Sequence, residues 1–304
     1  MNGNADTSIK SDAGSVLLAC AQCRQDSVTS VLGNLGTISE IRDGSIKCDR
    51  CGTEYAVVEG IPIAIPADQI QPVSIPSKMV DAEHREFGFP PTKRIAELLS
   101  RNSSGLSLDV GCGKGPYLEY FKGGLVFADV NYYFIKEALR SYNGDGRVLG
   151  VVADARNLPF LDCSFDNVFC MEMLEHIDVP EILEMVEQFK RIARVRVQVD
   201  VPNEAALLRY IRGLFHRLGV FDTTEHEDTA LDYHSSFTPS LLRSRGFEVH
   251  GCIGAVSRIE IPLGFIWDIY DSIAWRLPGI AGTLIGIHEK PAISSAGSSG
   301  KASP

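Results

Sequence analysis

Residues 106–118, with the sequence LSLDVGCGKGPYL, constrain the fold of this chain more than any other stretch. An apolar run over 106–110 leads directly into three alternate glycines, Gly111, Gly113 and Gly115. This pattern predicts a buried strand, a tight turn and the start of a helix, which is the local layout of a nucleotide-type binding site. Glycines suit such a turn because a Cβ would block the approach of a ligand to the backbone.

The same stretch narrows the class of ligand. The dinucleotide fingerprint requires a third glycine at its sixth position, and that position is Pro116 here. Asp109 stands just before the first glycine, where its carboxylate would repel a pyrophosphate but would attract a cationic amino group. S-adenosylmethionine (SAM) carries an ammonium and a sulfonium and no phosphate, so these residues favour SAM over a dinucleotide.

Strands and helices alternate through the rest of this region, which predicts a parallel sheet with helices on both faces. In such a sheet the ligand binds at the carboxyl ends of the strands. We expect strands at 106–110, 125–130, 147–154, 165–171, 195–201, 247–255 and 283–290, and helices at 93–101, 115–122, 132–142, 180–193 and 237–246.

Acidic residues end the first three of these strands. Asp129 ends the second strand, where it can accept hydrogen bonds from both hydroxyls of a ribose. Asp154 ends the third, where it can accept from an adenine amino group. Three aspartates in register around a glycine loop predict a nucleoside site better than they predict three solvated loop residues.

Four motifs carry a resemblance: LDVGCGKG, FADVN, VVADARNLPF and SFDNVFCMEMLEHI. Their order and spacing resemble the class I SAM-dependent methyltransferases, most closely the group that includes ubiquinone and menaquinone methylases, over about residues 93–260. The resemblance implies a Rossmann-like α/β fold with a seven-stranded, mostly parallel sheet that ends in an antiparallel hairpin. It also implies SAM as cofactor, bound by Asp109, Gly111, Cys112, Gly113, Asp129, Val130, Asn131, Asp154, Ala155, Met171 and Glu172.

Methyl transfer is an in-line displacement at a sulfonium, so positioning supplies most of the catalysis. A general base is needed only where the acceptor is a hydroxyl or amine that must lose a proton. The candidates for that base are His176, His226 and His234. For His176 we favour a structural role at the start of a helix over catalysis.

A second strong signal is the pair of motifs Cys20-Ala-Gln-Cys23 and Cys48-Asp-Arg-Cys51. Two such pairs at this spacing predict a closed four-thiolate structural zinc site, with buried free thiols as the alternative. The surrounding residues, LLACAQC and CDRCGTEYAVVEGIPIAIP, resemble the zinc-ribbon activator subunit of tRNA and protein methyltransferases. We interpret the other four cysteines as packing residues: Cys112, Cys163, Cys170 and Cys252.

These signals divide the chain into successive parts. We expect a disordered N-terminus (1–14), a zinc ribbon (15–66), a proline-containing linker (67–92), a SAM-dependent methyltransferase domain (93–291) with a lid insertion at about 203–236, and a disordered tail (292–304).

Charge and hydropathy bear on the partners. The net charge of −10 argues against a nucleic acid, which needs a basic surface, but does not exclude one. We favour a small-molecule or lipid-linked acceptor, with RNA methylation and a non-catalytic binding protein as alternatives. The amphipathic helix expected at 204–218 and the apolar, aromatic stretch at 263–281 are candidates for peripheral membrane contact, and the zinc ribbon for a protein partner. The sequence has neither a signal peptide nor a transmembrane run, so we expect a cytoplasmic protein, with membrane association left open.

Overall fold

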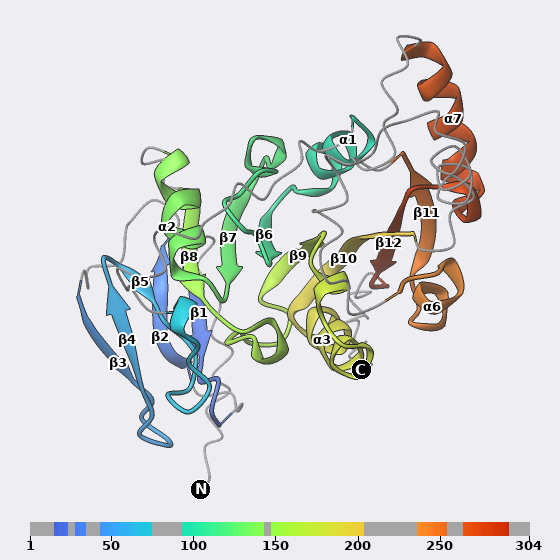
Figure 1. The fold of residues 1–304 in the computed structure, drawn as a ribbon. Coiled ribbons are helices and arrows are strands. Elements are labelled where there is room, and N and C mark those ends of the chain that lie inside the picture. Colours follow the sequence, from blue (N-terminus) through green and yellow to red (C-terminus); the bar gives the residue numbers. More distant parts are fainter. Residues whose placement is uncertain are drawn as a thin grey trace, which may run out of the picture.

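The computed structural model describes residues 15–23, 28–34, 43–74, 93–142, 147–203, 236–253 and 264–291. Its centre is a seven-stranded sheet with the strand order β11-β12-β10-β9-β6-β7-β8 (Figure 1). Strands β6 to β10 run parallel, and β12 lies antiparallel between β10 and β11. The bounds are β6 (Leu106–Val110), β7 (Gly124–Asp129), β8 (Val148–Val152), β9 (Phe165–Met171), β10 (Ala193–Pro202), β11 (Glu248–Cys252) and β12 (Thr283–Glu289).

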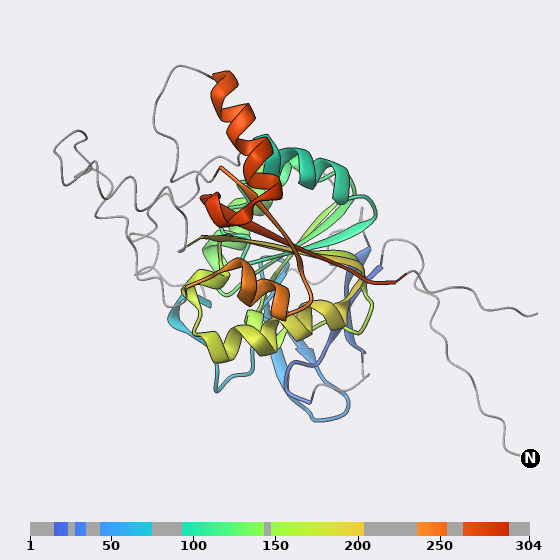
Figure 2. The same ribbon diagram turned by 90° about the vertical axis from the view of Figure 1, so that its right-hand side faces the viewer.

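Helices cover both faces of this sheet (Figure 2). On β7, Val126 and Ala128 join the buried cluster on one face, whereas Leu125 and Phe127 join the cluster on the other. This alternation inside an apolar strand is what a sheet covered on both faces requires. One face carries α1 (Lys93–Asn102), α2 (Tyr132–Ser141) and α7 (Gly264–Arg276), and the other carries α3 (Val179–Ile192) and α6 (Pro239–Ser244).

The predicted sheet and its antiparallel last hairpin are confirmed, but the helix predicted at 115–122 is wrong. Only one short 3-10 turn forms there, η3 (Leu118–Tyr120). The backbone is left-handed at Gly111, Gly113 and Gly115, and it becomes extended again at Phe121. The chain therefore turns into β7 before a helix can propagate. Because β7 and β9 lie on opposite sides of β6, the loop after β6 stands at the switch point of the sheet.

Two small antiparallel sheets precede this domain. One pairs β1 (Ser15–Ala19) with β2 (Val28–Asn34), and the other joins β3 (Gly44–Lys47), β4 (Glu54–Val58) and β5 (Ile61–Pro62). The chain after β5 extends the large sheet at its β8 edge, where Ile63 pairs in parallel with Val152 and the Ala64 N–H donates to the Val152 carbonyl at 2.8 Å. These N-terminal strands therefore pack directly on the large sheet (Figure 1).

Some predictions fall on residues outside the described ranges: both termini, most of the linker, and the lid with helix 204–218. None of the described helices is long and apolar enough to cross a membrane. One cysteine prediction was wrong. Cys112, Cys170 and Cys252 are buried as expected, but Cys163 is exposed, because it lies in a turn with a left-handed backbone (φ 51°) that faces solvent.

Candidate functional site

The loop after β6 surrounds an open space at one of its glycines. All three glycines have positive φ, namely 71° at Gly111, 53° at Gly113 and 74° at Gly115. A Cβ on Gly111 would lie 2.9 Å from Met173 Cβ, and one on Gly115 would lie 3.2 Å from Ala138 Cβ. A Cβ on Gly113 would meet nothing within 4 Å. Gly111 and Gly115 therefore serve packing, whereas Gly113 borders space that a ligand can fill.

Asp109 and Asp129 lie on either side of this loop. Asp129 Oδ1 accepts from the Asn131 N–H at 2.8 Å, and its Oδ2 accepts from the Gly113 N–H at 3.0 Å. Each carboxylate oxygen keeps a further lone pair that can accept from a hydroxyl. Asp109 is 1% exposed, and its Oδ2 has no hydrogen-bond partner among the described residues. Burial, with the charge of Asp129 as a second cause, raises the pKa of Asp109 to about 7.

Asp154 was expected to end the third strand, but β8 ends at Val152, so Asp154 lies two residues beyond it, and its carboxylate already has a partner. It caps the short turn η4 (Ala155–Asn157) by accepting from the Arg156 N–H. The Arg156 guanidinium also donates to both oxygens, with Nη2 lying 2.7 Å from Oδ2. Its Nη1 forms an ion pair with Glu181 Oε1 at 3.1 Å. Asp154 is therefore held in one orientation at the β8 end of the site.

Further acidic side chains gather at the ends of β9 and β10, and the sequence interpretation missed most of them. Glu172 follows β9, Glu175 lies in the short turn η5 (Leu174–His176), and Asp200 lies in β10. The Glu172 N–H donates to Asp200 Oδ1 at 2.9 Å. One oxygen each of Glu175 and Asp200 is buried without a hydrogen-bond partner in the described part of the chain. The strand-end rule that selected Asp129 would also have selected Asp200.

The predicted histidines are not brought together by the described structure. His176 is exposed at the end of η5, and its N–H bonds to the Met173 carbonyl. It lies three residues before α3 and not at the start of that helix, so its role stays a prediction. His226 and His234 lie outside the described residues.

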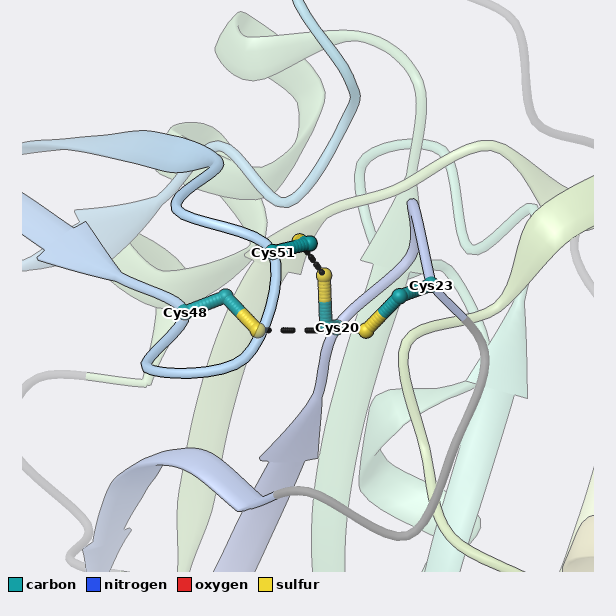
Figure 3. A group of neighbouring side chains, drawn as sticks. All are labelled: Cys20, Cys23, Cys48 and Cys51. Carbon is teal, nitrogen blue, oxygen red and sulfur yellow. Dashed lines mark hydrogen bonds between the residues drawn. The ribbon is translucent and has the colours of Figure 1, made fainter.

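The four cysteines of the N-terminal unit converge on one point (Figure 3). All four sulfurs lie within 4.8 Å of one another, with 3.5 Å between Cys20 and Cys51 and 3.8 Å between Cys23 and Cys48. Disulfide sulfurs would lie about 2 Å apart. Four sulfurs bound to one tetrahedral zinc at about 2.3 Å would stand about 3.8 Å from one another. The cluster is therefore compatible with zinc binding and not with disulfides.

Two groups around the sulfurs favour zinc binding. Backbone N–H groups, that of Cys51 most and that of Arg50 less, lower the pKa of the Cys48 thiol to about 6. The buried Tyr55 hydroxyl accepts from the Gln22 N–H at 3.1 Å and lies 3.1 Å from Cys20 Sγ. Its own proton is therefore free to point at that sulfur, as outer-shell donors do around metal-bound ligands.

The cysteine centre is joined to the loop that carries Asp154. The Asn157 side-chain amide donates to the Ala21 carbonyl, between Cys20 and Cys23, at 2.8 Å. The Ala19 N–H donates to the Pro159 carbonyl at 2.9 Å. Together with the bond from Ala64 to Val152, these contacts hold segment 152–160 from two sides.

Comparisons with known proteins found similar methyltransferases. Residues 108–196 match the family model of a methyltransferase domain. An O-methyltransferase of Aspergillus nomiae is 26% identical over 169 residues, which cover 46% of this chain and 75% of that protein. The 27-O-demethylrifamycin SV methyltransferase of Amycolatopsis mediterranei is 29% identical over 110 residues, covering 34% and 40%. A solved SAM-dependent methyltransferase from Archaeoglobus fulgidus aligns with a TM-score of 0.40 at 18% identity, covering 65% of this chain and 94% of that one.

The match therefore spans three quarters of the first relative's length and less than half of the second's. The family model begins at residue 108, so the cysteine unit lies outside it. The domain match and the named relatives support a methyltransferase enzyme, and the seven-stranded sheet gives the chain a Rossmann-like α/β fold.

Proposed function

We propose that this methyltransferase takes its methyl group from SAM and passes it to a hydroxyl of a small or lipid-linked molecule. The observation that carries the donor is the open space at Gly113 together with the buried Asp109 carboxylate, whose Oδ2 has no hydrogen-bond partner among the described residues. A cationic amino group fits both, because it fills the space and compensates the charge. SAM supplies a methyl group on a sulfonium, which is the leaving group of the reaction.

The protein's own residues would hold this donor along the strand ends. Asp109 and the loop at Gly111–Gly113 would bind the methionine part, and Asp129 would accept from the ribose hydroxyls. Asp154, oriented by Arg156, would face the adenine. Fixing the donor in this way lets positioning supply most of the rate.

Two observations support a small acceptor with a hydroxyl group. The curated relatives reported above include enzymes named for O-methylation, one of them acting on a rifamycin. The net charge of −10 counts against RNA, since phosphate binding needs a basic surface. Neither observation distinguishes a soluble acceptor from a lipid-linked one.

We further propose that the four cysteines hold a structural zinc ion. The support is the sulfur spacing, which suits one tetrahedral ion, and the backbone donors that favour the Cys48 thiolate. With four protein ligands, such an ion would leave no open position for substrate, so its part is to stabilise the N-terminal strands.

Two experiments test the activity. Isothermal titration with S-adenosylhomocysteine should give one site per chain, and an absence of binding would refute the donor. Labelled SAM should then be offered to an organic-solvent extract of cells and, separately, to total RNA. We expect label in the extract; label in RNA alone would overturn the proposed acceptor.

A further inference from the structure

Glu172, the first residue after the central strand β9, has an unusual backbone. Its φ is 50°, in the left-handed region that residues other than glycine seldom adopt. Such a conformation is strained, and residues that keep it cluster at functional sites. Here it is held by Asp200, whose Oδ1 and main-chain carbonyl both accept from the Glu172 N–H, at 2.9 and 3.2 Å.

We call the loop after β6, residues 111–117, the donor loop. The Glu172 side chain lies between this loop and the end of β10. Tyr117, at the end of that loop, hydrogen-bonds to the Glu172 carboxylate. Met173, the next residue, packs beside Gly111 in the same loop. Glu172 keeps partial exposure, whereas Asp200 is fully buried. Glu172 is therefore the member of this group that a bound acceptor can reach.

The groups that face Glu172 are other acids and one tyrosine. Asp200 comes from β10, Glu175 from η5 and Tyr117 from the loop after β6, and Asp109 of β6 lies near Asp200 and Tyr117. Among these groups Tyr117 is the hydrogen-bond donor to the Glu172 carboxylate.

The two carboxyl groups differ in burial and in hydrogen bonding. Burial, with the charge of Glu172 as a second cause, raises the pKa of the fully buried Asp200 well above its ordinary value. Burial raises the pKa of Glu172 as well, but its carboxyl is partly exposed and accepts from Tyr117, which lowers the pKa. Of the two, Glu172 therefore has the surroundings that favour the charged form more.

We propose that Glu172 is the general base of the methyl transfer, with Asp200 and Tyr117 as positioning residues. This inference rests on the proposed function, assigns the step to a residue other than the three histidines, and replaces the role in SAM binding that the resemblance implied for Glu172. As the bond between the acceptor oxygen and the methyl carbon forms and the sulfur–methyl bond breaks, the hydroxyl proton passes to a Glu172 oxygen. S-adenosylhomocysteine leaves with the sulfur electron pair, and Glu172 returns its proton to water once the products depart.

The test compares variants that distinguish the role of the Glu172 carboxyl group from that of Asp200. Transfer of label from saturating SAM into the organic-solvent extract gives the rate, and titration with S-adenosylhomocysteine gives donor affinity. Glu172→Gln should lower the rate about 10²- to 10⁴-fold, the usual contribution of a general base, while the donor Kd changes less than about threefold. Asp200→Asn imitates the protonated acid, so it should lower the rate less than about tenfold. Glu187→Gln, on the exposed side of α3, is the matched control.

The pH profile adds a readout that a structural role would not move. The wild-type rate should fall at acid pH as Glu172 becomes protonated. This fall should be absent in Glu172→Gln. Glu172→Asp, which keeps a carboxylate, should restore part of the rate together with the fall at acid pH. An inactive Asp200→Asn beside an active Glu172→Gln would overturn the assignment, as would a loss confined to donor affinity. If the wild-type protein binds no donor or labels no extract, the proposed function fails instead.

Discussion

Replacing single glycines in the donor loop tests the assignment of the space beside Gly113. Gly111 and Gly113 both have left-handed backbones, so alanine at either costs about 1–2 kcal/mol in backbone strain. At Gly113 the new methyl group meets nothing within 4 Å. At Gly111 it overlaps the Met173 side chain, which adds about 1–3 kcal/mol of overpacking.

The two variants should therefore fail in different ways. Without donor, Gly113→Ala should lose about 1–2 kcal/mol of unfolding free energy and Gly111→Ala about 2–5 kcal/mol. The methyl group of Gly113→Ala occupies the space proposed for the donor, and an overlap of about 1–3 kcal/mol weakens binding about 5- to 150-fold.

Chemical denaturation without donor measures the first effect, and titration with S-adenosylhomocysteine measures the second. A Gly113→Ala protein that binds the donor as tightly as wild type would refute the reasoning, because the space would then belong to something else. Equal stability of the two variants would contradict the packing role of Gly111.

Three further predictions concern the acid beside the loop and the cysteine centre. The pKa of Asp109 is raised to about 7, and a cationic amino group favours its charged form, so donor binding should release a proton and weaken as pH falls below about 7. Titrations of the donor from pH 8 to pH 6 should show this loss of affinity, and Asp109→Asn should make the affinity less dependent on pH. Cys48→Ser should remove the zinc, about one ion per chain, as read by metal analysis, and unchanged metal content would refute the site. Asn157→Ala leaves the buried Ala21 carbonyl without this donor and should cost about 1–3 kcal/mol in denaturation, with faster hydrogen exchange in 152–160; unchanged exchange there would show that the cysteine centre does not support this segment.

Local patterns predicted much of the sheet, because apolar runs and the acids at strand ends can be recognised from consecutive residues. The strands expected at 106–110 and 165–171 have those bounds in the structure. The contact between Glu172 and Asp200 joins residues 28 positions apart, and it depends on the register that pairs Asp200 with Met171. Periodicity carries no information about register between strands. The contact between these two residues therefore could not be predicted, although a strand-end rule could have selected Asp200 itself.

The N-terminal strands pose the same difficulty. The cysteine spacing predicted a metal centre, and the four sulfurs do converge. Nothing in the spacing indicated that residues 63–64 would pair with Val152 of the large sheet. That contact depends on the shape of two surfaces that form only after both parts have folded.

The pairing at Val152 has a consequence for how the protein behaves when it is cut. Strand β8 is the last strand of the large sheet, and its outer edge is covered by the chain around Ile63 and Ala64. A chain that starts at residue 67 would expose the unpaired carbonyl of Val152 beside apolar side chains. Bare strand edges are templates for pairing with other molecules. The part from residue 67 onwards should therefore self-associate on expression more than the whole chain does, because it lacks the segment that covers this edge.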